Sequence, residues 1–156
     1  MPRPRFAALN TDFVLALAGG SHQGAIDTLG RLGYYFLVSP VVEESLFDIH
    51  TSGKHRSSRE TAAKALKSLA AWGFLTPHLD GLGRHYTREA AVSMRTANIC
   101  PGCYQNDYLA VAEASHLEAE VLVTARPVVN CSDAINFALY EAELQPIRLL
   151  QMLDFA

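Results

Sequence analysis

Four short apolar runs divide the chain into segments with a different spacing of hydrophobic residues. The runs cover residues 5–9, 34–39, 121–123 and 147–153, and each contains few or no polar side chains. Strands that are apolar on both faces are typical of parallel sheets covered by helices on both sides. The sequence therefore predicts an α/β fold of three layers, α/β/α, with a central, mainly parallel sheet.

The segments between these runs carry apolar residues at helical spacing. Ser39 is the expected N-cap of a helix that starts with Pro40, because proline is tolerated in the first helical turn. We expect residues 77–86 to form a turn-rich connection, since Asp80-Gly81 and Gly83 favour turns. Helices are predicted over residues 13–18, 21–32, with Ser21 as the cap, 41–50, 58–72, 87–96, 107–117 and 132–144.

Length and composition narrow the class of protein. The chain has 156 residues, of which 49% are hydrophobic and 19% charged, so we expect one folded domain over residues 1–156 rather than a disordered chain. No apolar run approaches the roughly 18 residues that a membrane span needs. No signal peptide is recognisable at the N-terminus, and we expect a cytoplasmic location without membrane contact.

Charge gives one local signal. Thirteen Lys and Arg against sixteen Asp and Glu give a net charge of −3, so no global basic field favours nucleic acid. A basic cluster with a single acid, Glu60, could still contact phosphates, although a solvated helix face explains it equally well. The cluster consists of Lys54, Arg56, Arg59, Lys64 and Lys67.

Two of the three cysteines form a CxxC pair, Cys100 and Cys103. Such a pair can share a zinc ion or form a redox couple. Zinc needs two more ligands, and a redox couple is expected at a helix N-terminus. We interpret the pair as small residues of a loop and keep both functions as alternatives.

Three motifs, taken in order, resemble the PIN domain family. They are Leu9-Asn10-Thr11-Asp12-Phe13-Val14-Leu15, the junction at residues 37–44, and the segment from Asn106-Asp107 to Thr124. Active PIN proteins are metal-dependent nucleases, and many are bacterial ribonuclease toxins. The resemblance implies carboxylates that hold Mg²⁺ or Mn²⁺, because hard divalent cations prefer oxygen ligands and can activate water beside a phosphate.

This sequence matches the family pattern of four acidic positions at only two of them. Glu44 and Asp107 match two of its acids, while Asn10 stands at the first place with Asp12 two residues later. The resemblance thus makes Asp12, Glu44 and Asp107 the expected metal ligands, with Asn10 beside them. Arg126 stands at the fourth place, where it would repel a cation or contact a phosphate.

The resemblance leaves two functions open. One is a Mg²⁺- or Mn²⁺-dependent endoribonuclease that acts on RNA, and the other is a degenerate, noncatalytic relative that binds nucleic acid or a protein partner. It also implies a protein antitoxin or a homodimer as partner.

A different interpretation covers only the middle of the chain. Residues 57–69 resemble a winged-helix recognition segment, and residues 83–87 would form the wing. That reading predicts a DNA-binding regulator at residues 57–90 and requires strands after Phe74.

Overall fold

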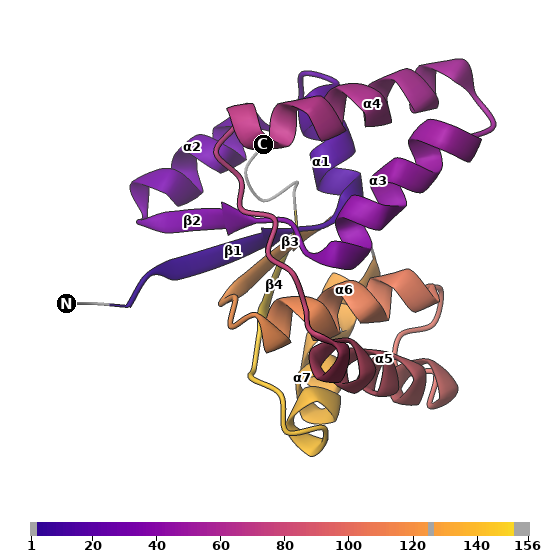
Figure 1. Ribbon diagram of the computed structural model, residues 1–156. Coiled ribbons are helices and arrows are strands. Elements are labelled where there is room, and N and C mark those ends of the chain that lie inside the picture. Colours follow the sequence, from indigo (N-terminus) through magenta and orange to yellow (C-terminus); the bar gives the residue numbers. More distant parts are fainter. Residues whose placement is uncertain (1–2, 125–126, 152–156) are drawn as a thin grey trace.

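A four-stranded, all-parallel sheet lies at the centre of the structure (Figure 1). The computed structural model describes residues 3–124 and 127–151. The strand order is β2-β1-β3-β4, so the first strand of the chain is an inner strand. This confirms the predicted parallel α/β fold. The strands are β1 (Arg5–Leu9), β2 (Tyr34–Leu37), β3 (Val121–Thr124) and β4 (Arg148–Gln151).

Helices cover both faces of this sheet, and each face is covered by one half of the chain (Figure 1). The first layer contains α1 (Thr11–Ala18), α2 (Gln23–Arg31), α3 (Pro40–Ser52) and α4 (Arg56–Ala71). The second contains α5 (Gly81–Thr96), α6 (Gln105–His116) and α7 (Ser132–Glu141), which follows a short 3-10 helix at Pro127–Cys131.

Side chains of the strands alternate between two hydrophobic clusters. In β1, Ala7 and Leu9 join the cluster under α1–α4, and Ala8 joins the one under α5–α7. All three are at most 2% exposed. Burial on both faces explains why the strands have apolar runs without alternating polar positions.

Helix α5 begins six residues earlier than predicted. The Asp80 carboxylate accepts a hydrogen bond from the Gly83 backbone N–H (2.7 Å), which caps the helix. The turn signals of Gly81 and Gly83 are overridden by this cap. The expected wing at residues 83–87 is therefore helical, and the winged-helix interpretation is wrong.

The N-cap of α2 differs from the prediction, whereas α3 has the predicted N-cap residue. His22, with φ of 63°, rather than Ser21 precedes α2. Ser39 is at the N-cap of α3, but its side chain makes no cap hydrogen bond to that helix. Within the described residues, no helix is both long and apolar enough to cross a membrane.

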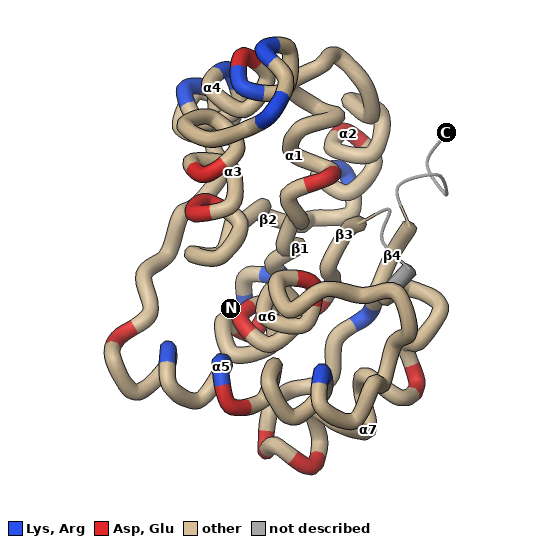
Figure 2. The backbone as a smooth tube through the Cα atoms, turned by 90° about the vertical axis from the view of Figure 1, so that its right-hand side faces the viewer, with Lys and Arg blue, Asp and Glu red and all other residues tan. Residues whose placement is uncertain are grey.

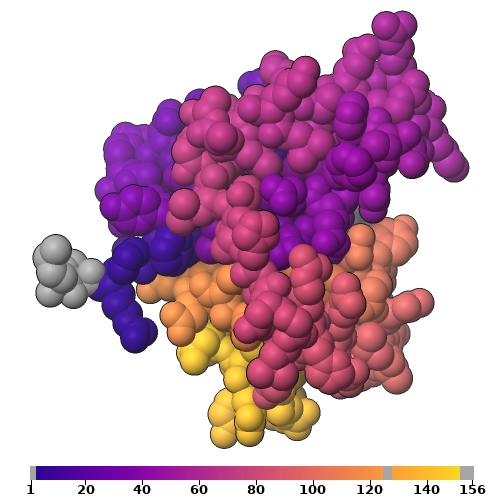
Figure 3. Space-filling model, viewed as in Figure 1, coloured from indigo at the N-terminus to yellow at the C-terminus, as the bar shows by residue number. Residues whose placement is uncertain are grey.

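Helices α3 and α4 pack against each other as an antiparallel pair. Their connected ends project from the rest of the molecule, as the space-filling view shows (Figure 3). The loop between them contains Gly53, the C-cap of α3. The other ends of the two helices pack into the cluster under α1–α4, through Leu46 of α3 and Leu69 of α4 among others.

Candidate functional site at the carboxyl ends of the strands

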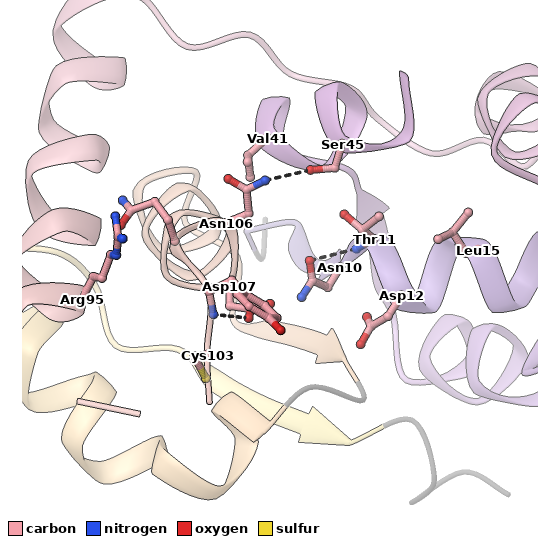
Figure 4. A pocket seen from close by; sticks show the side chains of 12 residues that line it. Asn10, Thr11, Asp12, Leu15, Val41, Ser45, Arg95, Cys103, Asn106 and Asp107 are labelled. Atoms are coloured by element: carbon pink, nitrogen blue, oxygen red, sulfur yellow. Dashed lines mark hydrogen bonds between the residues drawn. The ribbon is translucent and has the colours of Figure 1, made fainter. Parts of the chain in front are cut away.

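A pocket of about 750 Å³, lined by many polar residues, opens where β1 ends. It lies between the first turns of α1, α3 and α6, as expected for a ligand site in a parallel α/β sheet (Figure 4). Its apolar lining includes Leu15 and Val41. The polar lining residues are Asn10, Thr11, Asp12, Ser45, Arg95, Tyr104, Gln105, Asn106 and Asp107, with Cys103 beside them.

Hydrogen bonds connect the end of β1 to the end of β3 at the base of the pocket. The buried Asn10 amide donates from Nδ2 to the Thr124 hydroxyl (3.2 Å). That hydroxyl in turn donates to the Asp12 carboxylate, 3.0 Å from Oδ2. Asp12 Oδ1 also accepts from the Phe13 backbone N–H (2.8 Å) in the first turn of α1. Asp12 is thus fixed by both strands and by its own helix.

The first turn of α6 supplies the second carboxylate. Asp107 is 8% exposed, and its Oδ2 accepts a hydrogen bond from the Tyr104 backbone N–H (2.8 Å). This bond caps the helix, whose dipole also favours a negative charge at that end. The neighbouring Asn106 amide lies 3.4 Å from the Ser45 hydroxyl, which joins α6 to α3 across the pocket (Figure 4).

The expected third carboxylate, Glu44, does not line this pocket. Its side chain is 59% exposed and pairs with Arg84 of α5 at 3.3 Å. The α3 residues that face the pocket are Val41 and Ser45. Each residue turns a helix by 100°, so a shift of one position moves the side chain to another face. The i, i+4 spacing from Val41 is the signal that could have identified Ser45.

Glu113 is a buried acid that the sequence analysis missed. It is 4% exposed, and its Oε1 accepts a hydrogen bond from the Val41 backbone N–H (2.8 Å). Burial raises the pKa of Glu113, while the hydrogen bonds from Val41 and Ser39 oppose that rise. Glu113 therefore caps α3 from α6 and holds two walls of the pocket together. The one sequence feature that could have identified Glu113 is its position as an acid within the apolar stretch of residues 109–114.

The described donor set does not fit the predicted Mg²⁺ or Mn²⁺ centre. Asp12 and Asp107 are the carboxylates of the described residues that line the pocket, and Glu44 lies elsewhere. No group of three or more His, Cys, Asp or Glu side chains in residues 3–124 and 127–151 is arranged to hold a metal ion. Arg126, the fourth family position, lies outside the described residues.

The basic cluster lies on α4 and the loop before it. Arg56 pairs with Glu60 (2.8 Å), and Arg59 donates to the Gly53 carbonyl oxygen (2.7 Å). The remaining cations of the cluster, Lys54, Lys64 and Lys67, are exposed.

A small hollow connects this helix to the pocket. Its lining consists of Leu15, Ser57, Ser58 and Thr61. Leu15 also lines the pocket, so the first turns of α4 continue the same surface.

Solved structures of VapBC complexes share this fold. VapBC-1 from nontypeable Haemophilus influenzae aligns with a TM-score of 0.64 at 13% identity over 95% of this chain and 98% of that one. Rickettsia felis VapBC2, bound to a promoter DNA fragment, aligns with a TM-score of 0.62 at 14% identity, over 94% of this chain and 98% of that one. DNA-bound VapBC from Salmonella typhimurium aligns with a TM-score of 0.57 at 14% identity, over 96% of this chain and 99% of that one.

At these identities the likeness establishes the fold. No family model matches the sequence, and no curated protein matches it either. The chain therefore has the three-layer fold that its PIN-like motifs predicted.

Proposed function

We propose that this PIN-like protein binds single-stranded RNA in the pocket and does not cleave it. One observation carries the proposal: the pocket gathers amide and hydroxyl groups around two carboxylates, while the expected third carboxylate pairs with Arg84 on another surface. Metal-dependent phosphate cleavage relies on carboxylates that converge on a cation. Amides instead favour hydrogen bonding to bases.

The mouth of the pocket has the groups that unstacked bases need. Tyr104 is 71% exposed and offers a ring for stacking, and exposed Arg95 offers a cation for phosphate. The buried Oε1 atom of Gln105 has no hydrogen-bond partner among the described residues. A base amino group that donates to this oxygen would satisfy it.

A path for the RNA backbone leads from the pocket to α4. Ser57 and Thr61 line the adjoining hollow, and Lys64 follows on the same helix face at i+3 from Thr61. Figure 2 shows Lys and Arg gathered on α4, whereas the neighbouring α3 carries Asp and Glu. Phosphates would therefore follow α4 in a protein that is acidic overall.

The test is fluorescence anisotropy with a labelled single-stranded RNA of mixed sequence, in EDTA and then in Mn²⁺. We expect binding in both buffers and an intact RNA after incubation. Tyr104→Ala should weaken binding by about 5- to 150-fold, the loss of one stacked base. Tyr140→Ala is the matched control, because Tyr140 is 79% exposed on α7, away from the pocket.

Two results would contradict the proposal. Equal RNA affinity of the Tyr104 and Tyr140 variants would remove the pocket as the binding site. Cleavage that requires Mn²⁺ and disappears in Asp107→Asn would instead establish the metal-dependent ribonuclease.

A second candidate function is the binding of a protein partner, such as the antitoxin that the PIN resemblance implies. The structural neighbours are VapBC complexes. The supporting observation is a hollow on α3, where Phe47 is 57% exposed among Glu43, Glu44 and Asp48, with Leu66 of α4 beneath. An apolar centre with an acidic rim suits a basic, amphipathic segment.

A synthetic helical peptide of leucine and lysine can test this hollow. Phe47→Ala should weaken its binding, and Phe137→Ala, which removes a similarly exposed ring on α7, should not. Equal affinities would exclude the hollow. Sedimentation of the chain alone would reveal a homodimer, and its loss in Phe47→Ala would assign the hollow to a second copy.

A further inference from the structure

Three thiols from two distant segments meet beside the pocket. Cys100 and Cys103 precede α6, and their sulfur atoms lie 2.6 Å apart. Cys131, which precedes α7, forms a side-chain hydrogen bond with the Cys100 thiol. Cys131 is separated from the pair in the sequence by all of α6 and β3, and the fold brings it back to them.

A tight, anchored turn holds the first two sulfur atoms together. The Cys103 backbone N–H donates to the Cys100 carbonyl (3.1 Å), with Pro101 and then Gly102 at the central positions. Gly102 has φ of 87°, as the third residue of a type II turn requires. The Tyr108 hydroxyl accepts from the Cys100 N–H and donates to its carbonyl, both at 3.0 Å.

The surroundings give the thiols different access and reactivity. Cys103 lines the pocket and is half-buried, whereas Cys100 is 1% exposed. Cys103 directly precedes Tyr104, the N-cap of α6, so its thiol lies at the start of that helix. Burial is the main cause of the raised pKa of Cys100, and the pKa of Cys131 rises to about 11, chiefly through its hydrogen bond with Cys100.

The thiol cluster supports a disulfide rather than a zinc site. A disulfide needs two sulfur atoms only, and those of Cys100 and Cys103 are in direct contact. A structural zinc site needs four ligands. In addition, no group of three or more His, Cys, Asp or Glu side chains among the described residues is arranged to hold a metal ion.

We propose that Cys103 and Cys100 form a thiol–disulfide exchange site for small-molecule disulfides. The Cys103 thiolate attacks one sulfur of the reagent, which releases one thiolate and leaves a mixed disulfide on Cys103. Cys100, after losing its proton to solvent, attacks the Cys103 sulfur and releases the second thiolate. Both leaving thiolates take up protons, so two protein thiols are oxidised and one reagent disulfide is reduced to two thiols.

This chemistry would act on the pocket itself. The mixed disulfide on Cys103 places the reagent group among the lining residues, next to Tyr104. The internal disulfide then removes that group. Small disulfides would therefore block the pocket temporarily.

The test uses the full chain equilibrated with mixtures of reduced and oxidised glutathione, followed by alkylation and peptide mass mapping. We expect Cys100 and Cys103 to lose reactivity together, with a disulfide between them, while Cys131 stays open to alkylation. Cys100→Ser should trap one glutathione on Cys103. Cys103→Ser should react with oxidised glutathione at least tenfold more slowly, and Cys131→Ser should form the disulfide normally.

Three results would overturn the inference. They are a wild-type reaction rate in Cys103→Ser, a disulfide that maps to Cys100 and Cys131, and stoichiometric zinc in the purified protein that protects the thiols. Thermal melts of each variant separate a lost thiol from a lost fold. The readout involves no RNA, so it fails or succeeds independently of the proposed function.

Discussion

Glu113 is a buried residue of α6 whose carboxylate joins that helix to α3. Its carboxylate lies across the N-terminus of α3, where Val41 donates to it. The helix dipole and this bond favour the charged form, and burial opposes it more strongly. The nearby Glu44 raises the pKa further, and Arg84 lowers it.

The raised pKa of Glu113 predicts a stability that depends on pH. Above the usual value of 4.5, the folded state binds more protons than the unfolded state, so the free energy of unfolding falls as pH rises through the raised pKa. Glu113→Gln keeps an acceptor for Val41 and should flatten that fall. Urea unfolding between pH 4.5 and 8 measures it.

The matched control for this prediction is Glu89→Gln, which changes an exposed acid on α5. Its pH profile should follow the wild type. A Glu113→Gln profile as steep as the wild type would show that another group causes the dependence.

The residue scale is also where sequence reasoning about the site was least complete. Asn10, Asp12 and Asp107 were found because strand ends and helix starts can be located from local patterns, and the structure brings them to one pocket. Glu44 was expected there because the PIN resemblance implies an acid in the helix after the second strand, but the rotation of α3 brings Ser45 to the pocket instead. That rotation depends on tertiary packing.

At the scale of elements, local patterns predicted the strands well. The predicted runs at 5–9 and 121–123 agree with β1 and β3 to within one residue. The start of α5 was missed because a single capping bond at Asp80 outweighs two glycines. The supporting contact is also long-range, since Gly83 lies against His116 of α6. Turn propensity alone carries no information about such a neighbour.

The connection between α3 and α4 depends on a missing side chain at Gly53. A Cβ atom there would lie 2.6 Å from the Ile49 carbonyl oxygen, a backbone atom that cannot rotate away. We expect Gly53→Ala to lower the free energy of unfolding by about 1–3 kcal/mol, the usual effect of overpacking. Denaturant unfolding, monitored by circular dichroism, measures the change.

Gly30 provides the control for Gly53. It lies in α2, is exposed, and a Cβ atom there would meet nothing within 4 Å. Gly30→Ala should therefore raise the free energy of unfolding by about 0.5–1 kcal/mol. A Gly53→Ala protein as stable as the Gly30 variant would mean that the loop relaxes without cost.

At the scale of the whole molecule, charge is distributed unevenly. The net charge is −3, but exposed lysines gather on α4 beside an acidic α3 (Figure 2). Such an arrangement attracts a nucleic-acid backbone at one place while the rest of the surface repels it. In the proposed complex, this arrangement would restrict the orientation of the RNA.

This distribution predicts a salt-dependent loss of RNA affinity in Lys64→Ala/Lys67→Ala. Each phosphate contact on a single strand contributes about −0.7 to the slope of log K against log salt. The double variant loses two contacts, so its slope should be less negative by about 1.4. Anisotropy titrations at several salt concentrations measure the slope. The control is Arg31→Ala/Arg148→Ala, which removes two exposed cations from α2 and β4.

An unchanged slope in the lysine variant would remove α4 from the RNA path. An equal change in the control would indicate general charge attraction instead of a defined track.

The inner position of β1 has a consequence for synthesis on the ribosome. One edge of β1 pairs with β2 soon after residue 37 emerges, but the other must wait for β3 at residue 121. Translation of the roughly 80 intervening residues takes about 4–16 s. During that time α1–α4 can already cover their own face of the sheet, while the open edge of β1 is exposed to other nascent chains. Until β3 is synthesised, the N-terminal half thus has an unpaired strand edge, which is the feature most prone to pairing with a strand of another chain.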